Sequence, residues 1–287
     1  MLTKTETVGG SLGEPATAVL LRTLEDGVLT LTLNRPDRLN ALTIPLMRGL
    51  AESLSEAETD PDVHVVVLRS AGKGFCAGGD IKEGRKDDRA GDRPKTDPGY
   101  NRPEQRFDRL RKLAESPILL RRMLKPTIAA VRGAATGAGF NLALACDFRV
   151  VSRSAFFMTA FSKGGFSGDF GGSYFLTRLL GPAKARELFL LNPRIDAEEA
   201  HRLGLVTCLV DDEQLEADTQ ALARQLASGP RVAMRYMKQN LNAAENDRLE
   251  DVTDLEIVNM VRTGDTDDQK EAIRAMVEKR EPQYRGY

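Results

Sequence analysis

The chain has 287 residues, of which 41% are hydrophobic and 29% charged, so it is long enough to bury a large core. Its 41 Lys and Arg residues against 42 Asp and Glu residues leave a formal charge of -1, which excludes a global field that would attract nucleic acid or anionic lipid. No apolar run reaches membrane-spanning length, and the polar start lacks the apolar core of a secretory signal, so we expect no membrane association and a cytoplasmic protein.

The first part of the chain alternates between predicted strands and helices. Residues 1–15 are polar and rich in glycine, which predicts a flexible N-terminal arm. A strand is predicted at VLTLTLNRP (Val28 to Pro36), where apolar and polar residues alternate until proline ends the run. A helix is predicted at IPLMRGLAESLSEAETD, and HVVVLRSAG is typical of a buried strand that runs into a glycine loop.

The same order of elements returns further along the chain. TIAAVRG (Thr127 to Gly133) predicts a strand, GAGFNLALACD a helix and FRVVSRSAFF a further strand, so we expect an α/β core over residues 16–195. Between the two units, residues 84–106 are dense in charge, Pro and Gly and cannot bury enough apolar surface to fold alone. They predict a mobile surface loop, with a lid over bound substrate as the functional alternative. Residues 196–287 have mostly helical spacing.

The cysteines and histidines give little support for metal or nucleophilic chemistry. Cys76, Cys146 and Cys208 are odd in number and without CxxC spacing, which disfavours a disulfide framework or a zinc site. We expect three reduced, structural thiols. His64 and His201 do not neighbour a Ser or Cys elbow, so a Ser-His-Asp hydrolase is not supported.

One carboxylate, Asp169, lies in the small and apolar run AFSKGGFSGDFGG. A carboxylate in apolar surroundings loses hydration, so such a residue is usually either paired or retained for proton chemistry. Asp169 is therefore the first catalytic candidate. The structural alternative is that Asp169 caps the helix predicted at SYFLTRLLG, since Asp is favoured at helix starts. The two roles are compatible.

Two glycine loops each follow a predicted strand: GKGFCAGGDIKE (Gly72 to Glu83) and GAATGAGFNLALACD (Gly133 to Asp147). The first exposes backbone N–H groups, and the second opens a helix whose first N–H groups have no partner inside it. If they converge on one carbonyl they form an oxyanion hole, in which losing one donor costs about 10²–10³ in rate. The alternative is that both are plain turns. Neither fits a dinucleotide fingerprint.

Read together, these loops resemble the crotonase superfamily, also called the enoyl-CoA hydratase/isomerase family. LTLNRPDRLNAL resembles the family's opening strand and CoA-contacting loop, and RIDAEEAHRLGLV with EKREPQYRG resembles its C-terminal helices. The resemblance implies a spiral of ββα units with a C-terminal helical region, here residues 196–287, that mediates trimers, often paired into hexamers. It implies an acyl-CoA thioester as substrate and no metal or other cofactor beyond the CoA moiety.

The resemblance also implies roles for residues that bind the CoA ester. The backbone N–H groups of Gly79 and Ala138 match the oxyanion pair, which would hold the thioester carbonyl and stabilise an enolate.

Further positions match the family's contacts with CoA itself. Arg38 would contact the CoA phosphates, and the segment Ala77 to Ile81, which includes Asp80, would lie against the adenine. Lys279 would reach CoA from the C-terminal helix, either of the same chain or of a neighbouring subunit. Without the resemblance, the cations among these residues would be taken as solvated surface charges.

Departures from the family pattern indicate the reaction. The two glutamates that activate water in enoyl-CoA hydratases match Asn141 and Phe161, neither of which is an effective acid or base. Asp169 matches the aspartate of a subset of isomerases, and the chain most resembles the ring-1,2-epoxyphenylacetyl-CoA isomerase group of phenylacetate degradation. Ser167 and Gly168 replace the proline that usually precedes this aspartate. The resemblance favours an acyl-CoA double-bond or epoxide isomerase. A hydratase or acyl-CoA hydrolase of the same fold and a non-catalytic acyl-CoA binding protein are the alternatives.

Overall fold

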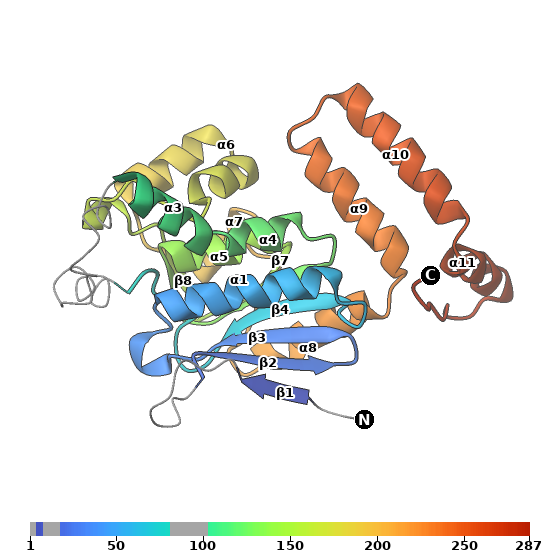
Figure 1. Cartoon of the computed structure of the whole chain (residues 1–287), viewed down its shortest axis with the longest axis horizontal. Helices are drawn as coiled ribbons and strands as arrows, with labels where there is room; N and C mark the ends of the chain where they lie inside the picture. The colour runs from blue at the N-terminus through green and yellow to red at the C-terminus, as the bar shows by residue number, and fades with distance from the viewer. Residues whose placement is uncertain (1–3, 8–17, 81–102) are drawn as a thin grey trace.

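The computed structural model describes residues 4–7, 18–80 and 103–287, and its centre is a mixed sheet flanked by helices (Figure 1). The seven strands of this sheet lie in the order β1 (Lys4–Thr7), β2 (Leu20–Glu25), β3 (Val28–Leu33), β4 (Val65–Ser70), β5 (Thr127–Val131), β7 (Phe148–Ser152) and β10 (Cys208–Val210). β1, β2 and β3 pair antiparallel, whereas β3, β4, β5, β7 and β10 pair parallel. A second sheet of three strands contains β6 (Ala134–Thr136), β8 (Phe156–Met158) and β9 (Ile195–Asp196).

The helices follow the predicted alternation with the strands. They are α1 (Ile44–Thr59), α3 (Pro103–Leu113), α4 (Ser116–Arg122), α5 (Ala138–Ala145), α6 (Gly172–Leu191), α7 (Ala197–Arg202), α8 (Leu215–Ala227), α9 (Arg231–Ala244), α10 (Leu249–Gly264) and α11 (Asp267–Glu278), with short 3₁₀ turns η1 (Pro36–Arg38) and η2 (Ser162–Gly164). The α/β fold with C-terminal helices predicted from the sequence is confirmed. None of the helices in the described ranges combines the length and apolar character needed to cross a bilayer.

The core explains why these segments form these elements. The apolar run of β4 is buried on both faces of the sheet, as expected for a parallel central strand. α1 begins at Ile44 and is capped by Thr43, whose hydroxyl accepts a hydrogen bond from the Leu46 N–H. The helix packs its apolar stripe onto the sheet. On the other face, Leu215 and Ala223 of α8 pack against Val65 and neighbouring strand residues. The packed core thus includes residues of α8 as well as the sheet.

Pairing of β4 with β5 positions both glycine loops. Val66 lies opposite Thr127 and Leu68 opposite Ala129 in a parallel register. The carboxyl ends of parallel strands meet at the same edge of a sheet, so the loops that follow β4 and β5 are brought side by side. The pairing of these two core strands thus brings together two loops that are far apart in the sequence.

Two segments differ from the sequence prediction. Lys4–Thr7, expected in a flexible arm, form strand β1 and pair antiparallel with β2; backbone pairing of this kind needs no apolar pattern. The last four residues of the predicted loop 84–106 form the start of α3, where Pro103 and Glu104 are favourable in the first turn. The rest of the predicted arm and of that loop lies outside the described residues.

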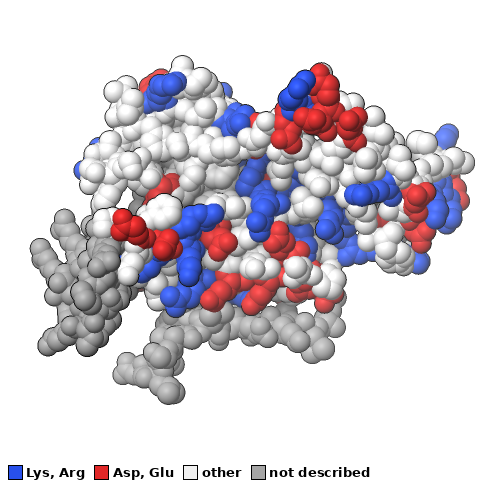
Figure 2. All heavy atoms as spheres, turned by 45° about the horizontal axis from the view of Figure 1, so that its top comes forward, with Lys and Arg blue, Asp and Glu red and all other residues white. Residues whose placement is uncertain are grey.

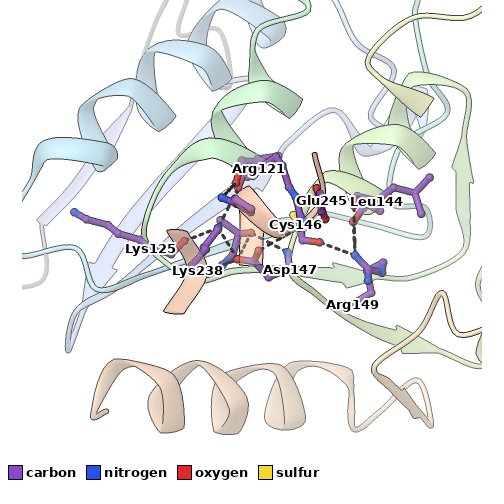
Figure 3. A network of polar contacts seen from close by, with 12 residues as sticks. Arg121, Lys125, Leu144, Cys146, Asp147, Arg149, Lys238 and Glu245 are labelled. Carbon is purple, nitrogen blue, oxygen red and sulfur yellow. Dashed lines mark hydrogen bonds and ion pairs between the residues drawn. The ribbon is translucent and has the colours of Figure 1, made fainter. Parts of the chain in front are cut away.

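The C-terminal helices α9, α10 and α11 extend away from the sheet (Figure 1), and a buried ion pair joins α9 to the core. Lys238, whose side chain is 8% exposed, donates to Asp147 Oδ2 at 2.6 Å and to the Lys125 carbonyl at 2.9 Å (Figure 3). The same carboxylate accepts from the N–H and hydroxyl of Thr127 at 2.8 and 2.9 Å. Arg121 of α4 adds an ion pair to Asp147 and another to Glu245 beyond α9.

Lys238→Met should lower the free energy of unfolding by about 3–5 kcal/mol, because it leaves the buried Asp147 carboxylate without its closest cation. Urea unfolding at neutral pH measures the change. Lys270→Met is the matched control: Lys270 pairs with Asp267 on the surface, where both side chains are 61% exposed, and should change stability by less than about 1 kcal/mol. Equal effects of the two substitutions would contradict the structural role of the buried pair.

Candidate active site

The two glycine loops meet as the sequence predicted. Cys76 donates its N–H to the Ala134 carbonyl and accepts from the Thr136 N–H, both at 2.9 Å. A methyl group built on Gly78, which has φ +87°, would lie 2.9 Å from the Thr136 carbonyl oxygen and 3.5 Å from the Ala138 nitrogen. Only glycine permits this conformation and this approach without strain. The first loop is therefore held against the start of α5.

The Gly79 N–H points away from the neighbouring segment that contains Leu42. The Gly78 carbonyl accepts a hydrogen bond from the Leu42 N–H at 2.7 Å. Because the peptide bond between Gly78 and Gly79 is trans, the Gly79 N–H points opposite to that carbonyl. Ala138 is the first residue of α5, so its N–H has no acceptor inside the helix. Neither N–H donates to any acceptor among the residues that the structure describes.

Asp169 lies in the turn between η2 and α6, and it does not cap the helix. α6 begins at Gly172, its N-cap position is Gly171, and no side chain caps it, so the structural alternative considered for Asp169 was wrong. Asp169 Oδ1 is buried and has no hydrogen-bond partner in the described part of the chain. Burial raises the pKa of this carboxyl above its ordinary value, and burial is the only cause of the shift.

Aromatic packing connects the Asp169 turn to the second glycine loop. The ring of Phe161 would contact a methyl group built on Gly137 at 4.0 Å and one built on Gly168 at 3.7 Å. It stacks on Phe189 of α6, with ring centroids 6.1 Å apart and an interplanar angle of 4°. The Asp169 turn therefore packs through Phe161 onto the loop that carries Ala138.

The raised pKa of Asp169 predicts a pH-dependent gain of stability in Asp169→Asn. Above the raised folded-state pKa, both states of the wild type hold an ionised Asp169, and the folded state carries the full cost of burying it. As pH falls toward the ordinary value of 3.8, the folded state binds the proton first and the wild type is stabilised relative to the variant. Asp169→Asn should be the more stable protein at pH 7, and its advantage should shrink between the raised pKa and 3.8. Thermal unfolding across this pH range measures it; a constant difference would contradict the assignment.

The remaining predicted ligand-binding residues lie in different places. Arg38 ends η1 with a side chain that is 57% exposed, and the Leu39 carbonyl beside it accepts from the Ala77 N–H. The Asp80 carboxylate is bound by Arg35, and Ile81 lies outside the described residues. Lys279 follows α11 at its C-terminal cap and is exposed, and α11 is well separated from α5 in Figure 1. The structure thus groups Arg38, Ala77 and Asp80 near the first loop but not Lys279.

Two residues that the sequence analysis missed hold the first glycine loop. Arg35 binds Asp80 Oδ2 through both terminal nitrogens at 3.1 Å, one residue after Gly79. Asn40 is fully buried and donates to the carbonyls of Ala71 and Gly74 at 2.9 and 2.8 Å. Asn40 has φ +54°, a conformation that Asn tolerates better than most residues. An Asn in a loop between apolar segments was the available signal.

Two of the three thiols, those of Cys76 and Cys146, are buried, as expected for structural cysteines. Burial raises the pKa of Cys76 and of Cys146 to about 12, so neither forms a thiolate near neutral pH. All three cysteines are free. The described ranges contain no group of three or more His, Cys, Asp or Glu residues arranged to hold a metal ion.

Comparison with known proteins agrees with this arrangement. The family model for enoyl-CoA hydratase/isomerase matches residues 23–287. The chain belongs to the enoyl-CoA hydratase/isomerase family. It is 40% identical over 267 residues to 1,2-epoxyphenylacetyl-CoA isomerase of Escherichia coli K12, covering 93% of this chain and 98% of the relative. It is 30% identical over 268 residues to trans-2-decenoyl-[acyl-carrier-protein] isomerase of Streptococcus mutans, covering 93% and 98%.

Solved members of the enoyl-CoA hydratase/isomerase family have the same fold. The crystal structure of an enoyl-CoA hydratase from Polaromonas sp. JS666 superposes with a TM-score of 0.84 at 35% identity, covering 93% of this chain and 99% of the relative. The crotonase fold expected from the resemblance is therefore confirmed. The family acts on acyl-CoA thioesters, which carry phosphates, and Figure 2 shows basic and acidic side chains interspersed on one face without a continuous basic patch. An anionic ligand on this face must be bound by individual cations.

Proposed function

We propose that this protein is an acyl-CoA isomerase that shifts a double bond or rearranges a ring epoxide. The observation that carries the proposal is one partly buried carboxylate, Asp169, packed through Phe161 onto the loop that leads into α5; among the described residues, neither this carboxylate nor the first N–H of α5 has a hydrogen-bond partner. A second N–H, that of Gly79, comes from the adjoining loop. The isomerase relative from Escherichia coli supports the same class of reaction.

For a double-bond shift, the proposed mechanism needs one general base and two hydrogen-bond donors to the thioester oxygen. The thioester oxygen accepts hydrogen bonds from the N–H groups of Gly79 and Ala138, which stabilise negative charge as it develops there. Ionised Asp169 removes a proton from a carbon of the acyl chain, and the electron pair of the C–H bond moves toward the thioester oxygen to form an enolate. The proton on the carboxyl of Asp169, which is partly exposed, exchanges with solvent; the carboxyl then donates a proton to a different carbon, and the enolate collapses. No atom is gained or lost, and the raised pKa of Asp169 makes it a stronger base for this transfer.

Solvent exchange provides the test of this function. NMR would follow deuterium incorporation into 2-enoyl, 3-enoyl and phenylacetyl-type CoA esters, together with any migration of the double bond. Isomerisation with deuterium exchange at the carbons that lose and gain the proton is the expected result. Tight binding of the esters without exchange would overturn the proposal and favour a non-catalytic binding protein.

Hydration is the second candidate, because a solved relative of the same fold is an enoyl-CoA hydratase. Asn141 and Phe161 occupy the positions matched to the water-activating glutamates, and Phe161 is packed against an aromatic ring. Neither side chain supplies an acid or a base. Incorporation of ¹⁸O from labelled water into the product would separate hydration or thioester hydrolysis from isomerisation.

We further propose that the protein assembles as a homotrimer or a dimer of trimers. Large apolar side chains on the C-terminal helices are exposed in the single chain, including Met237, Ile257, Met260 and Val261, around a groove of about 460 Å³ between α9 and α10. The separation of α11 from α5 within one chain supports a neighbouring subunit as the source of the proposed Lys279 contact with CoA. Light scattering of the purified protein tests the assembly.

A further inference from the structure

Asn141 is the polar residue of a helix that is otherwise small or apolar and wholly buried. All eight residues of α5 are buried, and Asn141 itself is 0% exposed. Its Nδ2 donates to the Asp169 backbone carbonyl at 2.8 Å, whereas its Oδ1 is buried and has no partner in the described part of the chain. Burying an amide with an unpaired oxygen is unfavourable, so packing alone does not explain the residue.

The Asn141 amide also lies against Gly172, the first residue of α6. A methyl group built on Gly172 would lie 2.3 Å from Asn141 Oδ1 and 2.5 Å from Nδ2. The first residue of α6 therefore has no room for a side chain. The amide of Asn141 lies between α5 and the turn that carries Asp169, in contact with both sides.

This turn needs outside support because its backbone is strained. Gly168, Phe170 and Gly171 have φ of +106°, +52° and +74°, and Phe170 adopts this left-handed conformation without being glycine. Among the described residues, the Asn141 amide is the one side chain that hydrogen-bonds the turn from Phe166 to Gly171. The turn is therefore anchored at the carbonyl of the proposed base.

We propose that Asn141 is a positioning residue for Asp169, holding the turn so that the carboxylate faces the thioester bound by the two glycine loops. The inference rests on the isomerase function proposed above. Fixing the carbonyl of Asp169 restricts its Cα, and hence the position of the carboxylate. A displacement of about 1 Å at a reacting group can lower the rate by about 10²-fold.

A double-mutant cycle tests this role with the isomerisation assay. Asn141→Leu removes the amide but keeps four side-chain heavy atoms with the same branching, and it should lower kcat by about 10–100-fold while KM changes less than about threefold. If Asn141 acts through Asp169, the same substitution should have no further effect on the residual rate of Asp169→Asn. Thr219→Val is the matched control: Thr219 is buried in α8 with an unpartnered hydroxyl, and the substitution should leave kcat unchanged.

The outcomes separate the two proposals. Full activity in Asp169→Asn would overturn the isomerase mechanism and this inference with it. A slow Asp169→Asn combined with a fast Asn141→Leu, or with additive effects in the double variant, would overturn the positioning role alone. If Asn141→Leu does not fold, Gly172→Ala supplies the same cycle, because its methyl group displaces the Asn141 amide. Gly172→Ala should lower kcat as Asn141→Leu does, and it should not slow the Asp169→Asn protein any further. An unchanged kcat in Gly172→Ala would overturn the positioning role of Asn141.

Discussion

Asp169→Asn should lower the rate of isomerisation by about 10²–10⁴-fold, the range typical of a lost general base. The substitution keeps the size and shape of the side chain but replaces a carboxylate by an amide that cannot accept the proton. Since Asp169 Oδ1 is buried without a partner, the neutral amide removes a desolvated charge and should not disrupt the turn. We therefore expect the affinity for CoA esters to be kept.

The measurement is deuterium exchange and product formation for wild type and variant, with ester binding followed by calorimetry. Asp247 is an exposed carboxylate in the connection between α9 and α10. Asp247→Asn is therefore the matched control and should retain the wild-type rate. A variant that binds esters as tightly as wild type and turns them over equally fast would rule out the single-base mechanism.

Ala138→Pro should lower the rate by about 10²–10³-fold, because it deletes one of the two proposed oxyanion donors. A backbone donor is seldom removable by substitution, but Ala138 is the first residue of α5, where proline fits the helix and costs no internal hydrogen bond. The preceding residue, Gly137, has φ +56° and ψ −128° and lacks the Cβ that would clash with the proline ring.

Ala138→Ser is the control, since it keeps the N–H and adds only one oxygen atom. Steady-state kinetics on both variants, with thermal unfolding to show that each is folded, separates the lost donor from a change in packing. Normal turnover by a folded Ala138→Pro protein would show that this N–H does not hold the oxyanion.

The core elements were predictable because their residues carry local patterns. β4 is a continuous apolar run, and α5 follows a glycine loop with a run of small and apolar residues, so strand, loop and helix were assigned correctly. The meeting of the two loops follows from the pairing of β4 with β5, which no local pattern indicates; from the sequence it was expected only through the family resemblance.

The parts that were missed depend on contacts between distant segments. The Arg35 ion pair with Asp80 joins residues from two loops, and nothing in either segment alone indicates it. α8 has an ordinary amphipathic pattern, which predicts a helix but not that it packs beneath the sheet. Asn141 was recognised as a poor acid or base, but its contact with the Asp169 carbonyl needs α5 and α6 to be packed together.

The parallel pairing of β4 with β5 has a consequence for the chemistry. The N–H groups of Gly79 and Ala138 reach the active site from the ends of these two strands, so their separation is tied to the strand register. A slip of one residue would move one donor by about 3.3 Å relative to the other, farther than a shared hydrogen-bonded oxygen tolerates. The backbone hydrogen bonds that join Cys76 to Ala134 and Thr136 hold the two loops in this register. Core substitutions that loosen this pairing should therefore impair turnover before they unfold the protein.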